Sequence, residues 1–182
     1  NKWGGDDLKK RYLPDMAAGA KIGAYCLSEA GAGSDAASLT TTARKDGDSY
    51  VLNGAKLWIT SGEYADTFLI MARTSSTGRS KDISAFIVDA KAPGLKVSKK
   101  EKKMGIRGSA TCEVLFENCR IPEANRIGDE GKGFGIALDT LDGGRTGIAA
   151  QAVGIARACM EDATAYAKQR EQFGEAIINF QA

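Results

Sequence analysis

The stretch TTTARKDGDSYVLNGAKLWIT, residues 40–60, decides the fold class. It is rich in β-branched and aromatic residues, and its DGD sequence indicates a hairpin turn in which Gly47 supplies the positive φ. A second turn is expected at Asn53-Gly54. The pattern therefore predicts three short strands, over residues 40–45, 49–53 and 55–60.

Four further segments have the same β-branched character and are bounded by turn-forming residues. They are residues 22–27, 67–74, 83–88 and 111–116. No long helical segment separates them, and short strands at close spacing favour an antiparallel barrel or sandwich.

Helical patterns lie on both sides of these strands. Residues 6–18 carry apolar side chains every three to four positions, and Pro14 indicates two short helices rather than one. From Gly133 the same period continues for roughly 30 residues, a helix of about 45 Å. A domain of this size does not cover such a helix, so we expect it to pack in a bundle or across subunits. We expect a break at Phe173-Gly174 and a second helix over residues 176–182. The fold class is therefore α+β, a central antiparallel β-barrel or sandwich flanked by helices.

Composition excludes several classes of protein. The 182 residues include no histidine, so Ser-His-Asp and Cys-His catalytic systems and His-ligated metals are excluded within this chain. The four cysteines form no C-x-x-C pair, which predicts no metal site and reduced thiols in an intracellular compartment. With 25 basic and 23 acidic side chains, the net charge of +2 gives no support for nucleic-acid binding.

The ends of the chain suggest a piece of something longer. The first residue is Asn1 rather than Met, no signal peptide follows it, and residues 180–182 stop inside a helix-like pattern. No apolar run approaches the ~18 residues of a membrane helix, so no integral membrane segment is expected.

A glycine-rich segment, YCLSEAGAGSD at residues 25–35, is the first candidate site. Gly31, Gly33 and Ala36 fit G-x-G-x-x-A, but the residues that follow predict a strand instead of the helix that a dinucleotide fingerprint must open. We reject the Rossmann interpretation. What remains is a turn with free backbone N–H groups and the hydroxyls of Ser28 and Ser34, which suits a phosphate or the edge of a planar ring. The alternative is a plain surface loop.

Three other clusters are candidates. Trp58 and Thr60 share one face of a strand and suit a flat heterocycle, unless Trp58 is an ordinary core residue. The DGGR sequence at residues 142–145 puts two glycines inside a helix, which costs roughly 2 kcal/mol and indicates a close ligand or tight helix packing. Its Asp142 and Arg145 can also simply pair with each other. At a helix end, Arg170 suits either the helix dipole or an external phosphate.

Together these segments resemble the acyl-CoA dehydrogenase family, closest to its short-chain (butyryl-CoA) members. The resemblance runs from about Leu8 to the end of the chain, and its motifs keep the order and spacing of that family. They are YCLSEAGAGSD at residues 25–35, LNGAKLWIT at 52–60, KMGIRGS at 103–109, DGGRTGIA at 142–149 and REQFG at 170–174. The joint match outweighs the plain structural alternatives for each motif.

The resemblance implies a homotetrameric flavoenzyme of three parts, with FAD lying between subunits. Residues 1–21 would be the end of an N-terminal helical domain, residues 22–130 the middle β-barrel domain, and residues 131–182 the start of a C-terminal four-helix bundle.

Matching positions imply the site residues. The implied FAD contacts are Tyr25, Cys26, Leu27, Ser28, Gly33, Ser34, Trp58, Ile59, Thr60, Arg170, Phe173 and Gln181. Among them, Thr60 would lie near N5 of the flavin, and Arg170 would reach the FAD phosphates of a neighbouring subunit. The implied acyl-CoA contacts are Ser34, Asp142, Gly143, Gly144 and Arg145.

Two departures from the family pattern matter. Ala30 stands where the family usually has proline, which predicts a slightly less rigid turn that still binds. Gly144 stands where isovaleryl- and long-chain-type members carry the glutamate that removes the α-proton. In most other members that glutamate lies further along, so we expect the catalytic base beyond Ala182 and none within this chain.

The implied activity is FAD-dependent dehydrogenation of a short- or branched-chain acyl-CoA to the trans-2-enoyl-CoA. Electrons would pass to an electron-transfer flavoprotein, in the bacterial cytoplasm or the mitochondrial matrix. Three alternatives stay open: an acyl-CoA oxidase, a non-catalytic flavin or acyl-CoA binding module, and a β-sandwich interaction domain.

Overall fold

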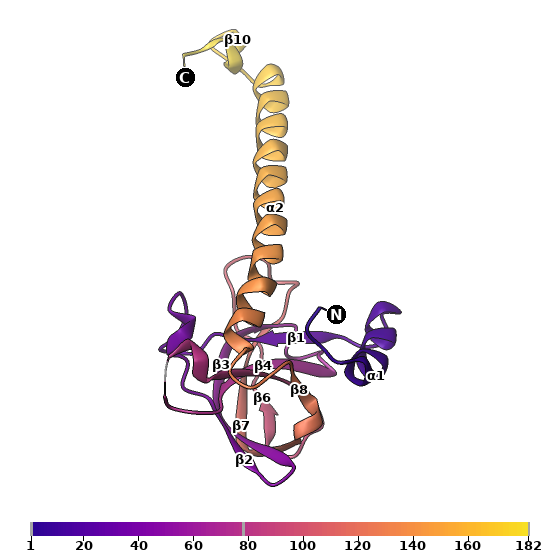
Figure 1. The fold of residues 1–182 in the computed structure, drawn as a ribbon. Coiled ribbons are helices and arrows are strands. Elements are labelled where there is room, and N and C mark those ends of the chain that lie inside the picture. The colour runs from indigo at the N-terminus through magenta and orange to yellow at the C-terminus, as the bar shows by residue number, and fades with distance from the viewer. Residues whose placement is uncertain (1, 78, 182) are drawn as a thin grey trace. The chain divides into compact units, whose positions relative to one another are not determined.

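The computed structural model describes residues 2–77 and 79–181. The chain forms two compact units, Asn1–Leu138 and Asp139–Ala182, which are described separately below. Figure 1 shows most of the strands in the first unit, and the second made mostly of one helix.

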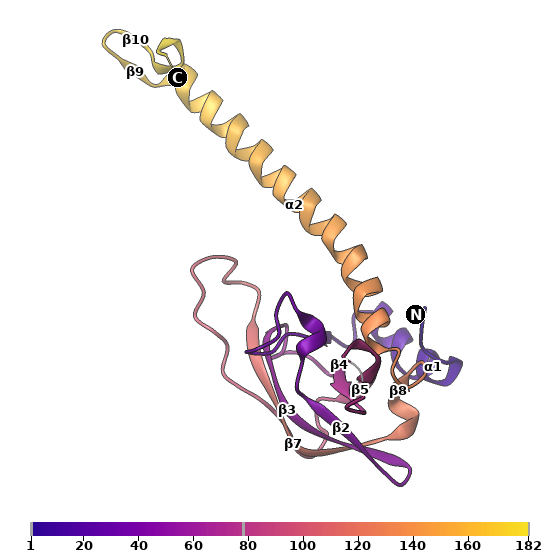
Figure 2. The same cartoon turned by 60° about the vertical axis from the view of Figure 1, so that its left-hand side comes forward.

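A mixed sheet builds the first unit, and the α+β class is confirmed. Its strands are β1 (Gly23–Cys26), β2 (Thr42–Asp46), β3 (Ser49–Thr60), β4 (Thr67–Arg73), β5 (Ile83–Asp89), β6 (Leu95–Val97), β7 (Thr111–Pro122) and β8 (Arg126–Ile127). The order is β6-β7-β3-β2-β4-β5-β8, and β1 adds to β4. Figure 2 shows β7, β3 and β2 side by side. Most pairs are antiparallel, as expected, but β1 and β2 both run parallel to β4. The wholly antiparallel description is therefore wrong at β4, because neither β1 nor β2 is joined to β4 by a hairpin.

The β2–β3 hairpin is confirmed, but the second turn is not. Gly47 has a φ of 64°, and Asp46 pairs with Ser49 across the turn. Gly54 instead lies inside β3, at a register shift against β7, with a φ of 144°. A Cβ there would lie 2.6 Å from Thr41 Oγ1. Asn53-Gly54 has the sequence of a turn, but in the structure this glycine is needed for a β-bulge and for the close approach of Thr41.

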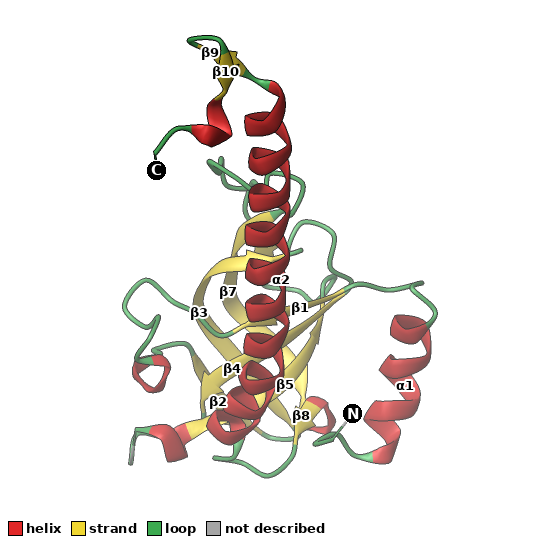
Figure 3. Cartoon of the chain, turned by 90° about the horizontal axis from the view of Figure 1, so that it is seen from above, coloured by secondary structure: helices red, strands yellow, loops and turns green. Residues whose placement is uncertain are grey.

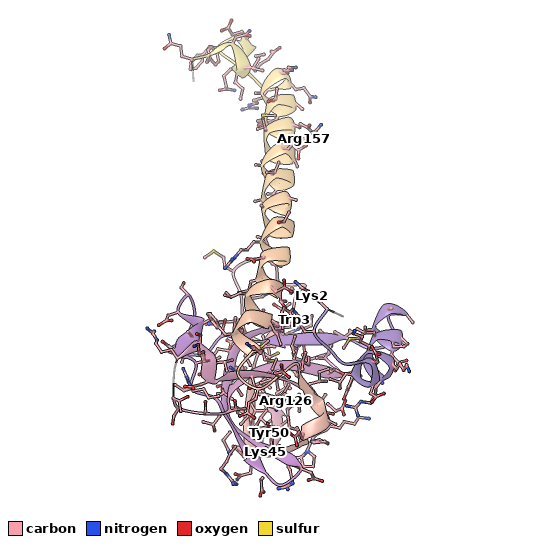
Figure 4. The ribbon with its side chains drawn as sticks, viewed as in Figure 1. Lys2, Trp3, Lys45, Tyr50, Arg126 and Arg157 are labelled. Carbon is pink, nitrogen blue, oxygen red and sulfur yellow. The ribbon has the colours of Figure 1, made fainter. Side chains whose placement is uncertain are left out.

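The hydrophobic core is formed mainly by buried side chains of β1, β2, β3, β4, β5 and β7. Tyr50 and Phe86 are fully buried with ring centroids 4.9 Å apart, and Tyr50 carries its hydroxyl to the edge of the core, 2.8 Å from Glu130 Oε2. Figure 4 shows Tyr50 near Lys45 and Arg126, and the Arg126 guanidinium lies 3.1 Å from the tyrosine oxygen. The sequence pattern did not predict β6 and β8, because these strands have only three and two residues.

Helix α1 (Asp6–Ala17) is one helix, not two. Leu8 and Tyr12 are its buried residues, and Figure 3 shows it beside the strands. Pro14 removes one intrahelical hydrogen bond, but it lies in the last turn, where that loss does not divide the helix.

All four cysteines are free, as expected. Cys26, Cys112 and Cys119 are buried, whereas Cys159 is exposed. Burial raises the pKa of Cys26 to about 12 and raises the pKa of Cys112 and Cys119 as well.

We expect the three buried thiols to react with a disulfide reagent such as DTNB at pH 8 only after unfolding, because the thiolate is the nucleophile and burial suppresses it. Counting the thiols that react before and after adding denaturant checks this. The Cys159→Ser variant is the control and should leave the three slow thiols unchanged. Rapid reaction at Cys26 in the native protein would contradict the expectation.

Helix α2 (Gly133–Gln169) provides most of the second unit. Beyond Asp139 it carries large apolar side chains that are more than half exposed, namely Ile148, Val153, Ile155, Met160 and Tyr166. The expectation that this helix packs in a bundle or across subunits stays a prediction. No helix within the described residues is long and apolar enough to span a membrane.

The expected second helix over residues 176–182 is wrong within the described part of that range. The chain instead forms a hairpin of β9 (Glu171–Gln172) and β10 (Glu175–Ala176), followed by a short 3-10 turn at Ile177–Asn179. The predicted break at Phe173-Gly174 is confirmed, because both residues have positive φ and reverse the chain. The Ile177 N–H then donates to the Arg170 carbonyl at 2.8 Å, which closes the hairpin.

Candidate functional site

The glycine turn (residues 28–34) joins β1 to a short 3-10 helix at Ala36–Ser38. Glu29 and Ala32 exchange two backbone hydrogen bonds, of 3.0 and 3.1 Å, which close it. A Cβ at Gly31 or Gly33 would meet no atom of the chain within 4 Å, and neither glycine has a positive φ. Nothing within the described structure therefore requires glycine at these two positions. Glycine there fits a ligand that approaches the backbone closely.

The residues of this motif differ in what they can offer a ligand. The side chains of Cys26 and Leu27 are buried, so only their backbone can reach an external molecule. Ser34 is exposed and Ser28 is partly exposed, which leaves both hydroxyls accessible. Tyr25 directs its hydroxyl to the Ala137 carbonyl at 3.4 Å, and burial raises its pKa to about 12.

Strand β3 presents the Trp58 face, made by the exposed side chains of Trp58 and Thr60. Trp58 is 64% exposed and has a φ of 61°, which is strained for a non-glycine residue. The register of β3 against β7 shifts between Lys56 and Ile59, so a bulge turns the indole outward while Ile59 stays buried. The alternative of a core tryptophan is therefore wrong.

The structure brings the glycine turn and the Trp58 face together. The Leu57 N–H donates to the Ser28 carbonyl at 2.9 Å. One residue earlier, Lys56 Nζ donates to the Leu27 carbonyl at 3.2 Å and to Glu29 Oε1 at 2.7 Å. Both charged side chains lie inside the quoted motifs, yet the sequence analysis missed them. The sequence feature that could have revealed this pair is a single lysine and a single glutamate, each inside a segment of mostly apolar or small residues.

The Lys56–Glu29 pair is almost fully withdrawn from solvent, with side chains 0% and 6% exposed. Burial alone raises the pKa of Glu29, but the Lys56 ammonium and hydrogen bonds from residues 40 and 41 outweigh it and lower the pKa to about 2. For Lys56, burial lowers the pKa and Glu29 opposes that shift. The carboxylate is therefore ionised at neutral pH.

A pH-dependent stability follows from the Glu29 shift. The folded-state pKa of about 2 lies below the ordinary 4.5, so the pair contributes stability above pH 4.5 that is lost as the pH falls towards 2. Urea unfolding at several pH values in this range measures it. The charge-free K56M/E29Q variant should lack this component.

Two exposed pairs also act in this pH range and must be separated from Glu29. Hydrogen bonding by Arg120 lowers the pKa of Asp46, and hydrogen bonding by Lys45 lowers that of Glu123. Both surface pairs are present in the wild type and in K56M/E29Q, so the difference between the pH slopes of the two proteins isolates the contribution of Glu29. Equal pH slopes in the two proteins would contradict the assignment.

A pocket of about 450 Å³ is lined by five basic side chains, two acidic side chains and two small residues. They are Lys99, Lys100, Lys102, Lys103 and Arg107, then Glu63 and Glu101, then Ser109 and Ala110. It lies next to the end of β3, where the Ser61 N–H donates to the Ala110 carbonyl at 2.9 Å. Its predominantly positive lining favours anionic groups. The KMGIRGS motif does not by itself predict a pocket, because the pocket depends on how this segment folds back beside β7.

The other candidate residues lie in the second unit. Asp142 and Arg145 form an ion pair of 3.0 Å with each other, and both side chains are mostly exposed. A Cβ at Gly143 or Gly144 would meet nothing within 4 Å. Phe173 is 97% exposed at the hairpin turn.

The remaining two positions are Arg170, which follows the last turn of α2, and Gln181, which follows the final 3-10 turn. Both are exposed. Because the two units are described separately, these residues and those of the first unit remain two candidate groups.

Comparison with known proteins agrees with the motifs. A family model described as the acyl-CoA dehydrogenase middle domain matches residues 24–119, more than half of the chain. The chain belongs to the acyl-CoA dehydrogenase family. A second model, the C-terminal domain of the same family, matches residues 131–182.

Individual relatives support the same family assignment. The short-chain-specific acyl-CoA dehydrogenase of Clostridium acetobutylicum is 50% identical over 181 residues, which cover 100% of this chain and 48% of that protein. Butyryl-CoA dehydrogenase from Megasphaera elsdenii has a TM-score of 0.94 at 45% identity, covering 99% of this chain and 47% of its own. The prolyl acyl carrier protein oxidase AnaB has a TM-score of 0.95 at 39% identity, and the match covers 99% of this chain and 48% of AnaB. The chain thus spans about half the length of the curated relatives it matches.

Proposed function

We propose that this chain is the flavin-binding part of an acyl-CoA dehydrogenase that converts a short- or branched-chain acyl-CoA to its trans-2-enoyl-CoA. The observation that carries the proposal is an outward-facing indole at Trp58, held at a strained φ of 61° beside a turn whose glycines are open to an external molecule. Strain of this kind persists where the surrounding structure enforces it and commonly marks a binding site.

The residues fit FAD, each in a limited role. Trp58 offers a plane for the ring system and Thr60 a hydroxyl for its edge, while Gly33 leaves room at the backbone and Ser34 adds a hydroxyl. The buried side chains of Cys26, Leu27 and Ile59 restrict these residues to backbone contacts. Bound FAD would accept a hydride from the β-carbon of the substrate.

Residues of the second unit are proposed ligand contacts as well. Asp142 to Arg145 would contact the acyl-CoA, and Arg170, Phe173 and Gln181 would reach the FAD of a neighbouring subunit in a homotetramer. The proton-abstracting carboxylate would come from beyond Ala182, since Gly144 has no side chain.

The proposed division into domains is residues 1–21 for the end of an N-terminal helical domain, residues 22–130 for the middle β-barrel domain, and residues 131–182 for the start of a C-terminal four-helix bundle.

Electrons would pass from the reduced flavin to an electron-transfer flavoprotein, in the bacterial cytoplasm or the mitochondrial matrix.

The test uses the full-length protein that carries these residues. We expect a yellow protein whose visible flavin absorbance bleaches anaerobically on adding butyryl-CoA. A protein that is colourless as purified, and takes up no FAD on reconstitution, would contradict the proposal. A protein that binds FAD without bleaching would support the non-catalytic binding module instead.

An oxidase is the second candidate, favoured by the likeness to AnaB, which is named as an oxidase. Peroxide production in air at the rate of substrate turnover would support this alternative. Turnover that requires an electron-transfer flavoprotein or an artificial dye would support the dehydrogenase.

A further inference from the structure

The Lys56–Glu29 pair joins three segments of the first unit at one buried point. Glu29 Oε1 accepts from Lys56 Nζ at 2.7 Å and from the Thr41 N–H at 3.0 Å. Glu29 Oε2 accepts from the Thr40 N–H at 2.6 Å and from its hydroxyl at 2.8 Å. Since Lys56 Nζ also donates to the Leu27 carbonyl, β3, the glycine turn and residues 40–41 share one hydrogen-bonded centre.

Stability alone is a weak reason for such a pair. Withdrawing a carboxylate and an ammonium from water is costly, and replacing a buried ion pair by neutral residues of similar volume is often neutral or stabilising. Buried charges are retained in some proteins because they specify one geometry among several. The location of the pair indicates which geometry that is.

The pair lies directly beside the strained bulge of β3. Lys56 is the last residue in register with β7 before the shift, and Ile59 is the first after it. Trp58 lies between them, inside the stretch of β3 where the register shifts. The same lysine donates to Leu27, which directly precedes the glycine turn, and to Glu29 within it.

We propose that Lys56 and Glu29 form a positioning pair that sets the Trp58 face at a fixed distance from the glycine turn, so that a planar ring fits between them. This role rests on the proposed flavin function. Neither residue is assigned a contact with FAD or substrate, and both act through the segments they hold.

The main experiment compares K56M/E29Q with the wild type in the full-length protein. The change keeps both volumes and removes both charges. The control is K96M/E117Q, the same exchange in a pair of identical 2.7 Å separation whose side chains are each 62% exposed on β6 and β7. Two quantities are measured: the FAD dissociation constant, and amide hydrogen exchange over residues 55–60 in the FAD-free protein.

We expect K56M/E29Q to raise the FAD dissociation constant about tenfold, which corresponds to the loss of about one strong charged hydrogen bond. Exchange at Leu57, whose N–H is bonded to Ser28, should become faster in the same variant. The control should match the wild type within about twofold in both measurements. The proposal needs both changes, so an unchanged value of either one in K56M/E29Q overturns it.

If K56M/E29Q does not fold, a comparison of two variants at Thr40 tests the positioning role instead. Thr40 is exposed, so T40V removes one donor to Glu29 Oε2 with little risk to folding, whereas T40S keeps the hydroxyl. We expect about threefold weaker FAD binding and faster exchange at Leu57 in T40V, and neither in T40S. Equal behaviour of T40V and T40S overturns the proposal. A wild type that binds no FAD would refute the proposed function instead, while the exchange data would still test the link between the segments.

Discussion

Gly33→Val is expected to abolish FAD binding while leaving the fold intact. A side chain at this position meets no atom of the chain within 4 Å, and the backbone φ is not in the positive range that only glycine favours. Valine is therefore accommodated in the free protein. In the complex it would occupy the space through which the ligand approaches the backbone, so we expect at least about a 100-fold loss of affinity.

The measurement is FAD titration of the full-length apoprotein, alongside urea unfolding. The control is Gly5→Thr, at a second glycine where a Cβ meets nothing within 4 Å. Gly5 is the N-cap of α1, where threonine is tolerated as well as glycine, and it lies outside the candidate site. Both variants should unfold like the wild type, and only Gly33→Val should lose FAD. Normal FAD binding by Gly33→Val would remove the glycine turn from the site.

Trp58→Gly is expected to weaken FAD binding by about 30-fold, because it removes an aromatic surface worth about 2 kcal/mol on burial and stacking. Stability should stay within about 1 kcal/mol of the wild type. Glycine relieves the strain of a positive φ, and this gain offsets its larger conformational entropy in the unfolded chain. The exposed indole contributes little packing within the first unit, so its loss costs little there.

The comparison variant is Trp58→Phe, which keeps an aromatic plane and the strained φ. It should bind FAD more tightly than Trp58→Gly and unfold no later than the wild type. The readouts are FAD affinity and the urea midpoint. If Trp58→Gly unfolds much earlier than the wild type but binds FAD normally, the indole is a structural residue.

Local chemistry explains what could be read from the sequence. Gly47 between two β-rich segments specifies a hairpin because turn geometry depends on adjacent residues only. The same is true of the chain reversal at Phe173-Gly174. The five motifs identify the family because their order and spacing are written along the chain.

Two of the wrong expectations depended on contacts with residues outside the segment itself. Asn53-Gly54 resembles a turn, but Gly54 continues β3 because Thr41 leaves no room for a Cβ. Residues 176–182 resemble a helix, yet in the described part the backbone bond from Ile177 to Arg170 holds them in a hairpin and a 3-10 turn. Neither constraint can be seen from the neighbouring residues alone.

The sequence by itself determined the α+β class, the β2–β3 hairpin and the family, because these depend on local pattern and motif spacing. Only the tertiary structure decided that Trp58 faces outward and that Lys56 meets Glu29. Those two side chains are 27 residues apart, and their burial exists only once β3 has paired with β7 and the glycine turn has closed against it. A charge is costly to bury without its partner, so the site depends on long-range pairing that local pattern does not encode.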